Sequence, residues 1–372
     1  GIRLVSPRHE SSAAHMAGAY ARTTGRLGVC IASNGPGAAN VLPGIAVENG
    51  EGNRVLVLTS WRRAPIVGPD RGGTYQYFDQ VAVAKPMSKW AGAARSFERI
   101  PEVMHRAFRT AFRGRPGVVF VTIPEDVLNG RHEDAPTVLP PERYRRTAPL
   151  EPAAAAVREA AERLVAAERP LLHVGSGVVH AGAGPRVEAL AEALAAPVTA
   201  SWGGRPALDG RRPHTIPLLP PLIDEVRAGA DVVLALGTRF GETDWWGKPR
   251  YWGAPGSQDV IQVDCDEEIL GLNKPVGLAV LADVGRFTEA LLDELGRRDD
   301  LAARLPERRG RLEAWEEQRR GVQTFLRSMA GDPERAPMHP AQVPIACREF
   351  FEDDALLVID GGNTAVWTNL LH

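Results

Sequence analysis

Short apolar runs alternate with longer amphipathic segments along the first third of the chain. The apolar runs are GVCIAS (28–33), RVLVLTS (54–60) and PGVVFVTIP (116–124), and 3–7 predicts a further strand. The segments at 11–24 and 96–112 have helical spacing instead. Continuous apolar runs bounded by turn residues are typical of strands buried on both faces of a parallel sheet. The pattern therefore predicts a parallel α/β sheet within residues 1–128.

The same alternation returns after residues 129–150, which are rich in Pro, Arg and Glu and indicate a linker. A helix at 152–168 precedes the strands RPLLHV (169–174), DVVLALG (231–237) and DVIQVD (259–264). A charged helix is expected at 301–330, and DALLVIDGGNT (354–364) predicts one more strand and its turn. The predicted fold is a succession of doubly wound, Rossmann-like parallel-sheet domains: one before residue 129, one over 151–330 and the start of a third over 331–372. Both ends look cut, so we expect a fragment.

Composition narrows the possible partners and the cell compartment. The 44 basic and 46 acidic residues give a net charge of -2, which provides no strong attraction to nucleic acid. No apolar stretch approaches the roughly 20 residues that a membrane helix needs, so we expect no membrane contact. The three cysteines lack metal-ligand spacing. This indicates reduced thiols and a cytoplasmic protein.

Two patterns in the second domain have a structural and a chemical explanation. Gly175-Ser176-Gly177 follows a strand, but His180 stands where a dinucleotide-binding G-x-G-x-x-G motif has its last glycine. A tight turn is favoured, and a nucleotide-binding oxidoreductase is kept as an alternative. Asp264 and Asp266 also follow a strand; they are candidates for a metal pair, although helix capping is favoured.

The first domain carries more specific candidates. Glu10 stands where an alanine-rich helix begins, which suits either an acidic residue at the positive end of a helix or a catalytic carboxylate. Asn34-Gly35-Pro36-Gly37 forms a turn after a strand, and it is either a plain connection or a place where a ring approaches the backbone. Gln76 is either a polar loop residue or a group that orients substrate.

The order R-H-E, G-A-Y-A-R-x-T-G and S-N-G-P-G-A-A-N, followed by VLVLT, resembles the pyrimidine-binding domain of thiamine-diphosphate-dependent enzymes. The acetolactate synthase (acetohydroxyacid synthase)-like group is the most similar. The resemblance continues through GGTYQYFDQVAVAKPMSKW (72–90), RPLLHVGSG and VIQVDCDEEILGLNK of the central domain, and ALLVIDGGNTAVW. It implies a pyrimidine-binding domain over 1–128 that lacks its first strand and helix, a linker over 129–150, a central domain over 151–330 and the beginning of a diphosphate-binding domain over 331–372.

This resemblance also implies roles for individual residues. Glu10 would share a proton with the aminopyrimidine of thiamine diphosphate, beside the turn, and Gln76 would orient the substrate. The cofactor-binding residues implied are Glu10, Asn34, Gly35, Pro36, Gly37, Gly362 and Asn363. No metal ligand is assigned, since the family's Mg²⁺-binding motif lies beyond the end of this chain.

The implied activity is that of a carboligase or lyase acting on a 2-oxo acid through a C2 ylide and an enamine. The alternative within the class is a non-ligating decarboxylase of the benzoylformate or oxalyl-CoA type. Acetolactate synthases proper also bind FAD, but RRPHTIPLLPP (211–221) replaces the segment expected near the flavin, which counts against FAD. A homodimer or homotetramer with sites between subunits is implied.

Overall fold

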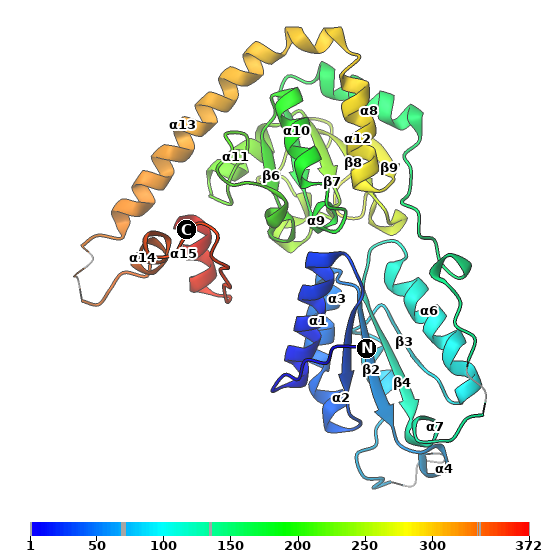
Figure 1. The fold of residues 1–372 in the computed structure, drawn as a ribbon. Coiled ribbons are helices and arrows are strands. Elements are labelled where there is room, and N and C mark those ends of the chain that lie inside the picture. Colours follow the sequence, from blue (N-terminus) through cyan, green and yellow to red (C-terminus); the bar gives the residue numbers. More distant parts are fainter. Residues whose placement is uncertain (1, 68–71, 134–135, 333, 335, 372) are drawn as a thin grey trace. The chain divides into compact units, whose positions relative to one another are not determined.

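We describe the chain from a computed structural model, which covers residues 2–67, 72–133, 136–332, 334 and 336–371. The chain divides into two compact units, the first made of residues 1–150 with 265–267 and the second of residues 151–264 with 268–372. Each unit is built on a parallel sheet with helices on both faces (Figure 1). The predicted fold class, successive α/β domains with parallel sheets, is confirmed.

The sheet of the first unit has the strand order β1-β2-β4-β3, and all its pairings are parallel. One face, with Val55 and Val57, packs against α1 and α3, and the other, with Leu56 and Val119, packs against α6. The strands are β1 (Gly28–Ala32), β2 (Val55–Trp61), β3 (Trp90–Ala93) and β4 (Val118–Pro124). The helices are α1 (Glu10–Thr24), α2 (Pro36–Asn40), α3 (Leu42–Glu51), α4 (Ala64–Val67), α5 (Gln80–Ala84), α6 (Ile100–Phe112) and α7 (Glu125–Leu128), with 3-10 turns η1 (Phe97–Arg99) and η2 (Pro141–Arg143).

The beginning of the first unit corrects one prediction. Residues 3–7 form no strand, and the side chains of Leu4 and Val5 are exposed. The segment after the Gly-Pro-Gly turn is helical, in two pieces that meet at Val41. Pro43 lies in the first turn of α3, where a missing N–H costs no hydrogen bond.

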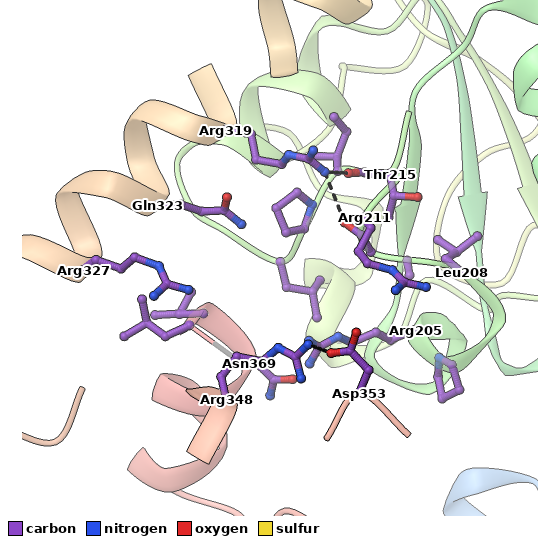
Figure 2. A pocket seen from close by; sticks show the side chains of 18 residues that line it. Arg205, Leu208, Arg211, Thr215, Arg319, Gln323, Arg327, Arg348, Asp353 and Asn369 are labelled. Atoms are coloured by element: carbon purple, nitrogen blue, oxygen red, sulfur yellow. Dashed lines mark hydrogen bonds and ion pairs between the residues drawn. The ribbon is translucent and has the colours of Figure 1, made fainter. Parts of the chain in front are cut away.

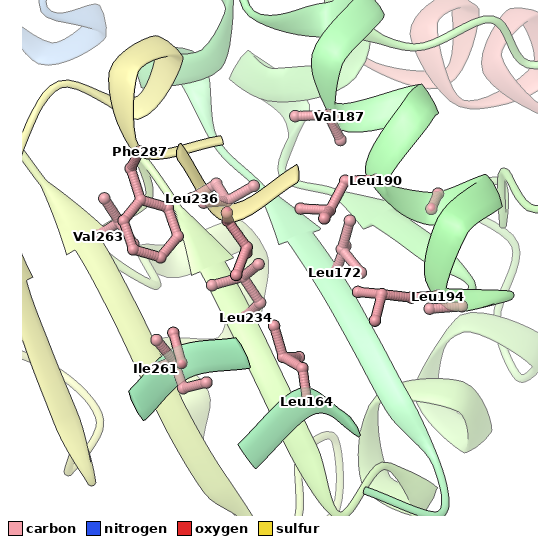
Figure 3. Close-up of a cluster of buried hydrophobic side chains, with 14 of the residues drawn as sticks. Leu164, Leu172, Val187, Leu190, Leu194, Leu234, Leu236, Ile261, Val263 and Phe287 are labelled. Atoms are coloured by element: carbon pink, nitrogen blue, oxygen red, sulfur yellow. The ribbon is translucent and has the colours of Figure 1, made fainter. Parts of the chain in front are cut away.

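The sheet of the second unit has the strand order β6-β5-β7-β8-β9 and is also parallel throughout. Alternate residues of β7 point to opposite faces. Leu234 and Leu236 join the cluster under α8, α10 and α12 (Figure 3), while Val233 and Ala235 pack toward α11. The strands are β5 (Pro170–Val174), β6 (Val198–Ala200), β7 (Val232–Leu236), β8 (Asp259–Asp264) and β9 (Leu278–Leu281).

The helices of this sheet domain are α8 (Ala154–Ala166), α9 (Ser176–His180), α10 (Gly184–Leu194), α11 (Leu222–Gly229) and α12 (Val284–Leu295). The 3-10 turns are η3 (Trp202–Ala207), η4 (Glu242–Gly247), η5 (Glu267–Ile269) and η6 (Asp299–Ala303). Beyond them follow α13 (Leu305–Met329), α14 (Gln342–Phe350) and α15 (Asn363–Leu371).

The long helix α13 is fastened to the sheet domain by buried arginines. Arg308 donates to the carbonyls of Leu164, Val165, Ala167 and Leu194, which end α8 and α10. Cationic side chains suit such positions because the last carbonyls of a helix lack intrahelical partners. Although α13 has 25 residues, neither it nor any other helix in the described ranges is long and apolar enough to cross a membrane.

The strand predicted within 354–364 does not form. The side chains of Leu356 and Val358 are 97% and 93% exposed, and no strand in the described ranges pairs with this segment. An apolar run becomes a strand only when a neighbour satisfies its backbone groups, so the pattern alone was not sufficient.

Candidate functional site

The sequence candidates of the first unit gather where its strands end. Gly35, Pro36 and Gly37 connect β1 to α2, at the carboxyl edge of the parallel sheet. Ligands of open α/β sheets bind at this edge. Glu10 reaches the same edge as the first residue of α1, where the His9 side chain caps the helix by accepting from the Ser11 N–H at 3.1 Å.

The Glu10 carboxylate is half-buried and only partly satisfied. Asn40 Nδ2 donates to Glu10 Oε2 at 3.2 Å, and Ser11 Oγ donates to the Asn40 carbonyl at 2.5 Å, so the start of α1 is tied to the end of α2. Within the described ranges no other donor reaches this carboxylate, which leaves Glu10 Oε1 without a protein partner. Burial first, and then the negative charge of Glu10, raise the pKa of the Cys30 thiol to about 11.

The glycine turn contacts Glu10 on one side and Gln76 on the other. A Cβ added at Gly37 would lie 2.5 Å from Ser33 Oγ and 3.6 Å from Glu10 Oε1. Gly35 has a φ of 58°, and a Cβ there would lie 2.6 Å from Gln76 Cβ. Gln76 itself has a φ of 57°, an uncommon conformation for a residue with a side chain and one that often marks functional sites.

Asn34 makes contacts that the sequence did not reveal. Its Nδ2 donates to Glu125 Oε1 at 2.7 Å, and Arg62 Nη1 lies 2.9 Å from the same oxygen. The Asn34 N–H also donates to Ser60 Oγ at 3.1 Å, so this residue fastens the turn to the ends of β2 and β4. The missed residues had a signal, because Arg62 and Glu125 directly follow β2 and β4 and must therefore lie at the sheet edge that carries the turn.

The remaining sequence candidates, Gly362, Asn363 and the Gly175-Ser176-Gly177 turn, lie in the second unit. Gly362 is exposed, with a φ of 70°, and Asn363 is the first residue of α15. A Cβ at Gly177 would lie 2.6 Å from Gly237 Cα, so this glycine lets the start of α9 pack closely against the end of β7. Within the described ranges, no three or more His, Cys, Asp or Glu side chains group so as to hold a metal ion.

Two family models match the chain over much of its length. The model described as the thiamine pyrophosphate enzyme N-terminal TPP binding domain matches residues 1–83, and the model of the central domain of the same enzymes matches residues 157–291. The chain belongs to the family of thiamine-diphosphate-dependent enzymes. The predicted resemblance is thereby confirmed.

Relatives within the thiamine-diphosphate family include both synthases and a decarboxylase. The chain is 35% identical to the "Probable 2-ketoarginine decarboxylase AruI" of Pseudomonas aeruginosa over 79% of its own length and 52% of that protein. It is 28% identical to an acetolactate synthase large subunit of Parasynechococcus marenigrum over 98% of its length and 58% of that subunit. The chain thus spans about half the length of the curated relatives it matches.

A solved structure shares the fold. The X-ray structure of a candidate thiamin diphosphate-dependent enzyme from Mycobacterium smegmatis superposes with a TM-score of 0.67. It is 23% identical and covers 78% of this chain, which covers 55% of that one. At this identity the likeness establishes the architecture alone.

Proposed function

We propose that this chain contributes the pyrimidine-binding side of a thiamine-diphosphate site, and that the whole protein acts on a 2-oxo acid as an acetolactate synthase-like carboligase or lyase. The observation that supports this most is the Glu10 carboxylate. It is held at a helix start, satisfied on one oxygen by Asn40, and lies beside a turn whose Gly35 and Gly37 have no side chain, at the carboxyl edge of a parallel sheet.

The residues fit a flat heterocycle in three respects. Glu10 Oε1 is available to hold a proton at a ring nitrogen, and its partial burial strengthens that hydrogen bond. Gly35 and Gly37 let a ring approach the backbone closely. The contacts of Asn34 with Glu125 and Ser60 keep the turn in place.

When bound, thiamine diphosphate supplies the carbon nucleophile and accepts the electrons released as CO₂ leaves a 2-oxo acid. Glu10 would hold the proton that keeps the ring in its reactive form. Gln76, beside Gly35, would donate to a carbonyl or carboxylate oxygen of the substrate. Gly362 and Asn363 would lie near the diphosphate, with Mg²⁺ held elsewhere and a second subunit completing the site; the proposal includes a homodimer or homotetramer in the cytoplasm.

Decarboxylation without ligation is the second candidate, and a specific observation favours it. The relative at 35% identity is named as a 2-ketoarginine decarboxylase, and an acetolactate synthase of Mycobacterium bovis is 33% identical, also over 79% of this chain. FAD is not part of the proposal, because RRPHTIPLLPP replaces the segment expected near the flavin.

The test compares the parent protein with Glu10→Gln, with thiamine diphosphate and Mg²⁺ present. CO₂ release is measured from a panel of 2-oxo acids that includes pyruvate and 2-ketoarginine, with and without FAD, and condensed products are assayed in parallel. Glu10→Gln should lower turnover by at least about 100-fold, the scale of an acid–base group. Calorimetric titration should also show weaker cofactor binding.

Glu102→Gln is the matched control. Glu102 is exposed on α6 and, in the part of the chain that the structure describes, pairs only with Arg99, so its replacement should leave turnover unchanged. Parent-like turnover and cofactor affinity in Glu10→Gln would refute the assignment. Release of CO₂ without a condensed product would favour the decarboxylase over the carboligase.

A further inference from the structure

A cavity of about 740 Å³ opens in the second unit beside α13 (Figure 2). Its wall combines the segment from the end of β6 to Leu218, one side of α13, and residues of α14 and α15. Five arginines line it, together with a single carboxylate, Asp353. The arginines are Arg205, Arg211, Arg319, Arg327 and Arg348. This concentration of positive charge contrasts with the net charge of -2 for the whole chain.

Much of this charge is not neutralised by the protein. Arg348 pairs with Asp353, and Arg211 pairs with Asp209 at 3.0 Å. Arg205 and Arg327 have no carboxylate partner among the residues that the structure describes. Both side chains are exposed to the cavity, where they remain available to an anion.

Two deeply buried groups in the same wall have polar atoms with no partner among the described residues. Thr215 is 6% exposed, and its Oγ1 makes no hydrogen bond. Arg319 is 8% exposed; its Nη1 donates to the carbonyls of Gly210, Arg212 and Thr215, but its Nε has no partner. Buried polar atoms are rarely left unsatisfied, and each such atom requires an explanation.

We propose that this cavity binds a phosphorylated small molecule that carries at least two negative charges. A phosphate group presents more acceptor oxygens than a carboxylate, which suits several guanidinium groups together with a hydroxyl donor. The volume lies in the range of small-molecule sites. Leu208, Ile216 and Leu218 give the cavity an apolar wall for the non-phosphate part of the ligand.

The cavity uses part of the segment RRPHTIPLLPP (211–221), with Arg211, Thr215 and Leu218, but not the glycines that border the crevice used by nucleotides in open sheets. It is not lined by Gly175 or Gly177 at the end of β5, nor by Gly237 at the end of β7. It also shares no residue with the proposed thiamine-diphosphate site, although Asn363 of that site lies on α15, whose Asn369 lines the cavity. The inference therefore stands or falls independently of the proposed function.

The test is calorimetric titration of the full chain with tripolyphosphate in Mg²⁺-free buffer of low ionic strength. Binding should be saturable, with one site per chain, and should weaken as salt is added. Arg205→Gln and Arg327→Gln should each weaken it by about tenfold or more, as expected for loss of a charge-assisted hydrogen bond. Arg320→Gln is the matched control, because Arg320 is exposed on α13 but does not line the cavity.

Four results would overturn the proposal. They are absence of saturable binding, equal weakening by Arg320→Gln, orthophosphate binding as tightly as tripolyphosphate, and citrate binding as tightly as tripolyphosphate. The third would show that the cavity takes a free phosphate ion rather than a larger phosphorylated molecule, and the last that phosphate is not distinguished from carboxylate. Circular dichroism of each variant establishes that a lost affinity does not reflect unfolding.

Discussion

Replacing Gly18 by alanine tests how closely α1, the helix that carries Glu10, packs on α3. An added Cβ would lie 1.7 Å from Glu48 Oε2 and 2.2 Å from Glu48 Cδ. Glu48 is only 6% exposed, and its carboxylate is held on both oxygens. Asn53 Nδ2 donates to Oε2 at 2.6 Å, and His15 Nδ1 lies 2.7 Å from Oε1. The methyl group can therefore be accommodated only if this carboxylate or the helix moves.

The expected loss is a balance of two effects. Hydrogen bonds to charged groups contribute about 1.5–3 kcal/mol each, and leaving the buried carboxylate unsatisfied adds a desolvation cost. Alanine in place of glycine in a helix returns about 1 kcal/mol. Because His15 is exposed and its contact contributes less, we expect Gly18→Ala to lower the free energy of unfolding of the first unit by about 2–4 kcal/mol. For a unit of this size the melting temperature should fall by roughly 5–15 °C, measured by calorimetry.

Two controls separate steric overlap from other effects. Gly50 also lies in a helix of the first unit, but nothing approaches within 4 Å of a Cβ built there, so Gly50→Ala should be neutral or slightly stabilising. In a Glu48→Ala background the obstruction is gone, and Gly18→Ala should then become stabilising by up to about 1 kcal/mol. If Gly18→Ala destabilises the Glu48→Ala protein as much as the parent, the steric argument is wrong.

Three further predictions concern buried cations and histidines of the second unit. Arg308→Ala removes four hydrogen bonds to helix ends and should weaken the docking of α13 by about 3 kcal/mol, detected as faster hydrogen exchange in that helix. Burial lowers the pKa of His173 and of His214, so below pH 6.5 the unfolded chain binds more protons than the folded chain. The free energy of unfolding should therefore decrease as the pH is lowered, by at most about 1.4 kcal/mol per pH unit for each histidine. His173→Gln should flatten the urea-unfolding profile between about pH 5 and 7. Burial lowers the pKa of Lys274 to about 8, so stability should rise from pH 8 to about 10, and Lys274→Met should abolish that rise.

The sheets could be predicted from sequence because their strands are buried on both faces. The runs that became β2, β4, β7 and β8 are continuous apolar segments, and turn residues bound each of them. The two wrong strands, at 3–7 and 354–364, have similar local patterns but no strand to pair with in the described ranges. Hydrophobic pattern reports what a segment is able to bury, whereas strand formation also depends on a neighbour that lies far away in sequence.

The candidate site was likewise predictable from the sequence only in part. Glu10, Gly35 and Gly37 could be proposed from the sequence because their order along the chain resembles a known motif and because glycine is required where the backbone is approached closely. Asn40 and Glu125 were missed because their roles depend on distances across the fold. Glu125 is 91 residues from Asn34, yet it accepts a hydrogen bond from that side chain at 2.7 Å.

The second unit satisfies its buried cations largely with backbone carbonyls, and this has an electrostatic consequence. Arg308 donates to four carbonyls and Lys274 to two, while the nearest carboxylate of Arg319, that of Glu316, is 3.9 Å away. Carbonyls satisfy hydrogen bonds without cancelling charge, so these groups keep their full positive field. Arg319, although 3.9 Å from Glu316, adds positive charge to the cavity beside Thr215, where Arg205 and Arg327 have no carboxylate partner in the described ranges. An anion from solution can neutralise the positive potential in the cavity. Titration with tripolyphosphate at two ionic strengths measures how much of the binding affinity is electrostatic.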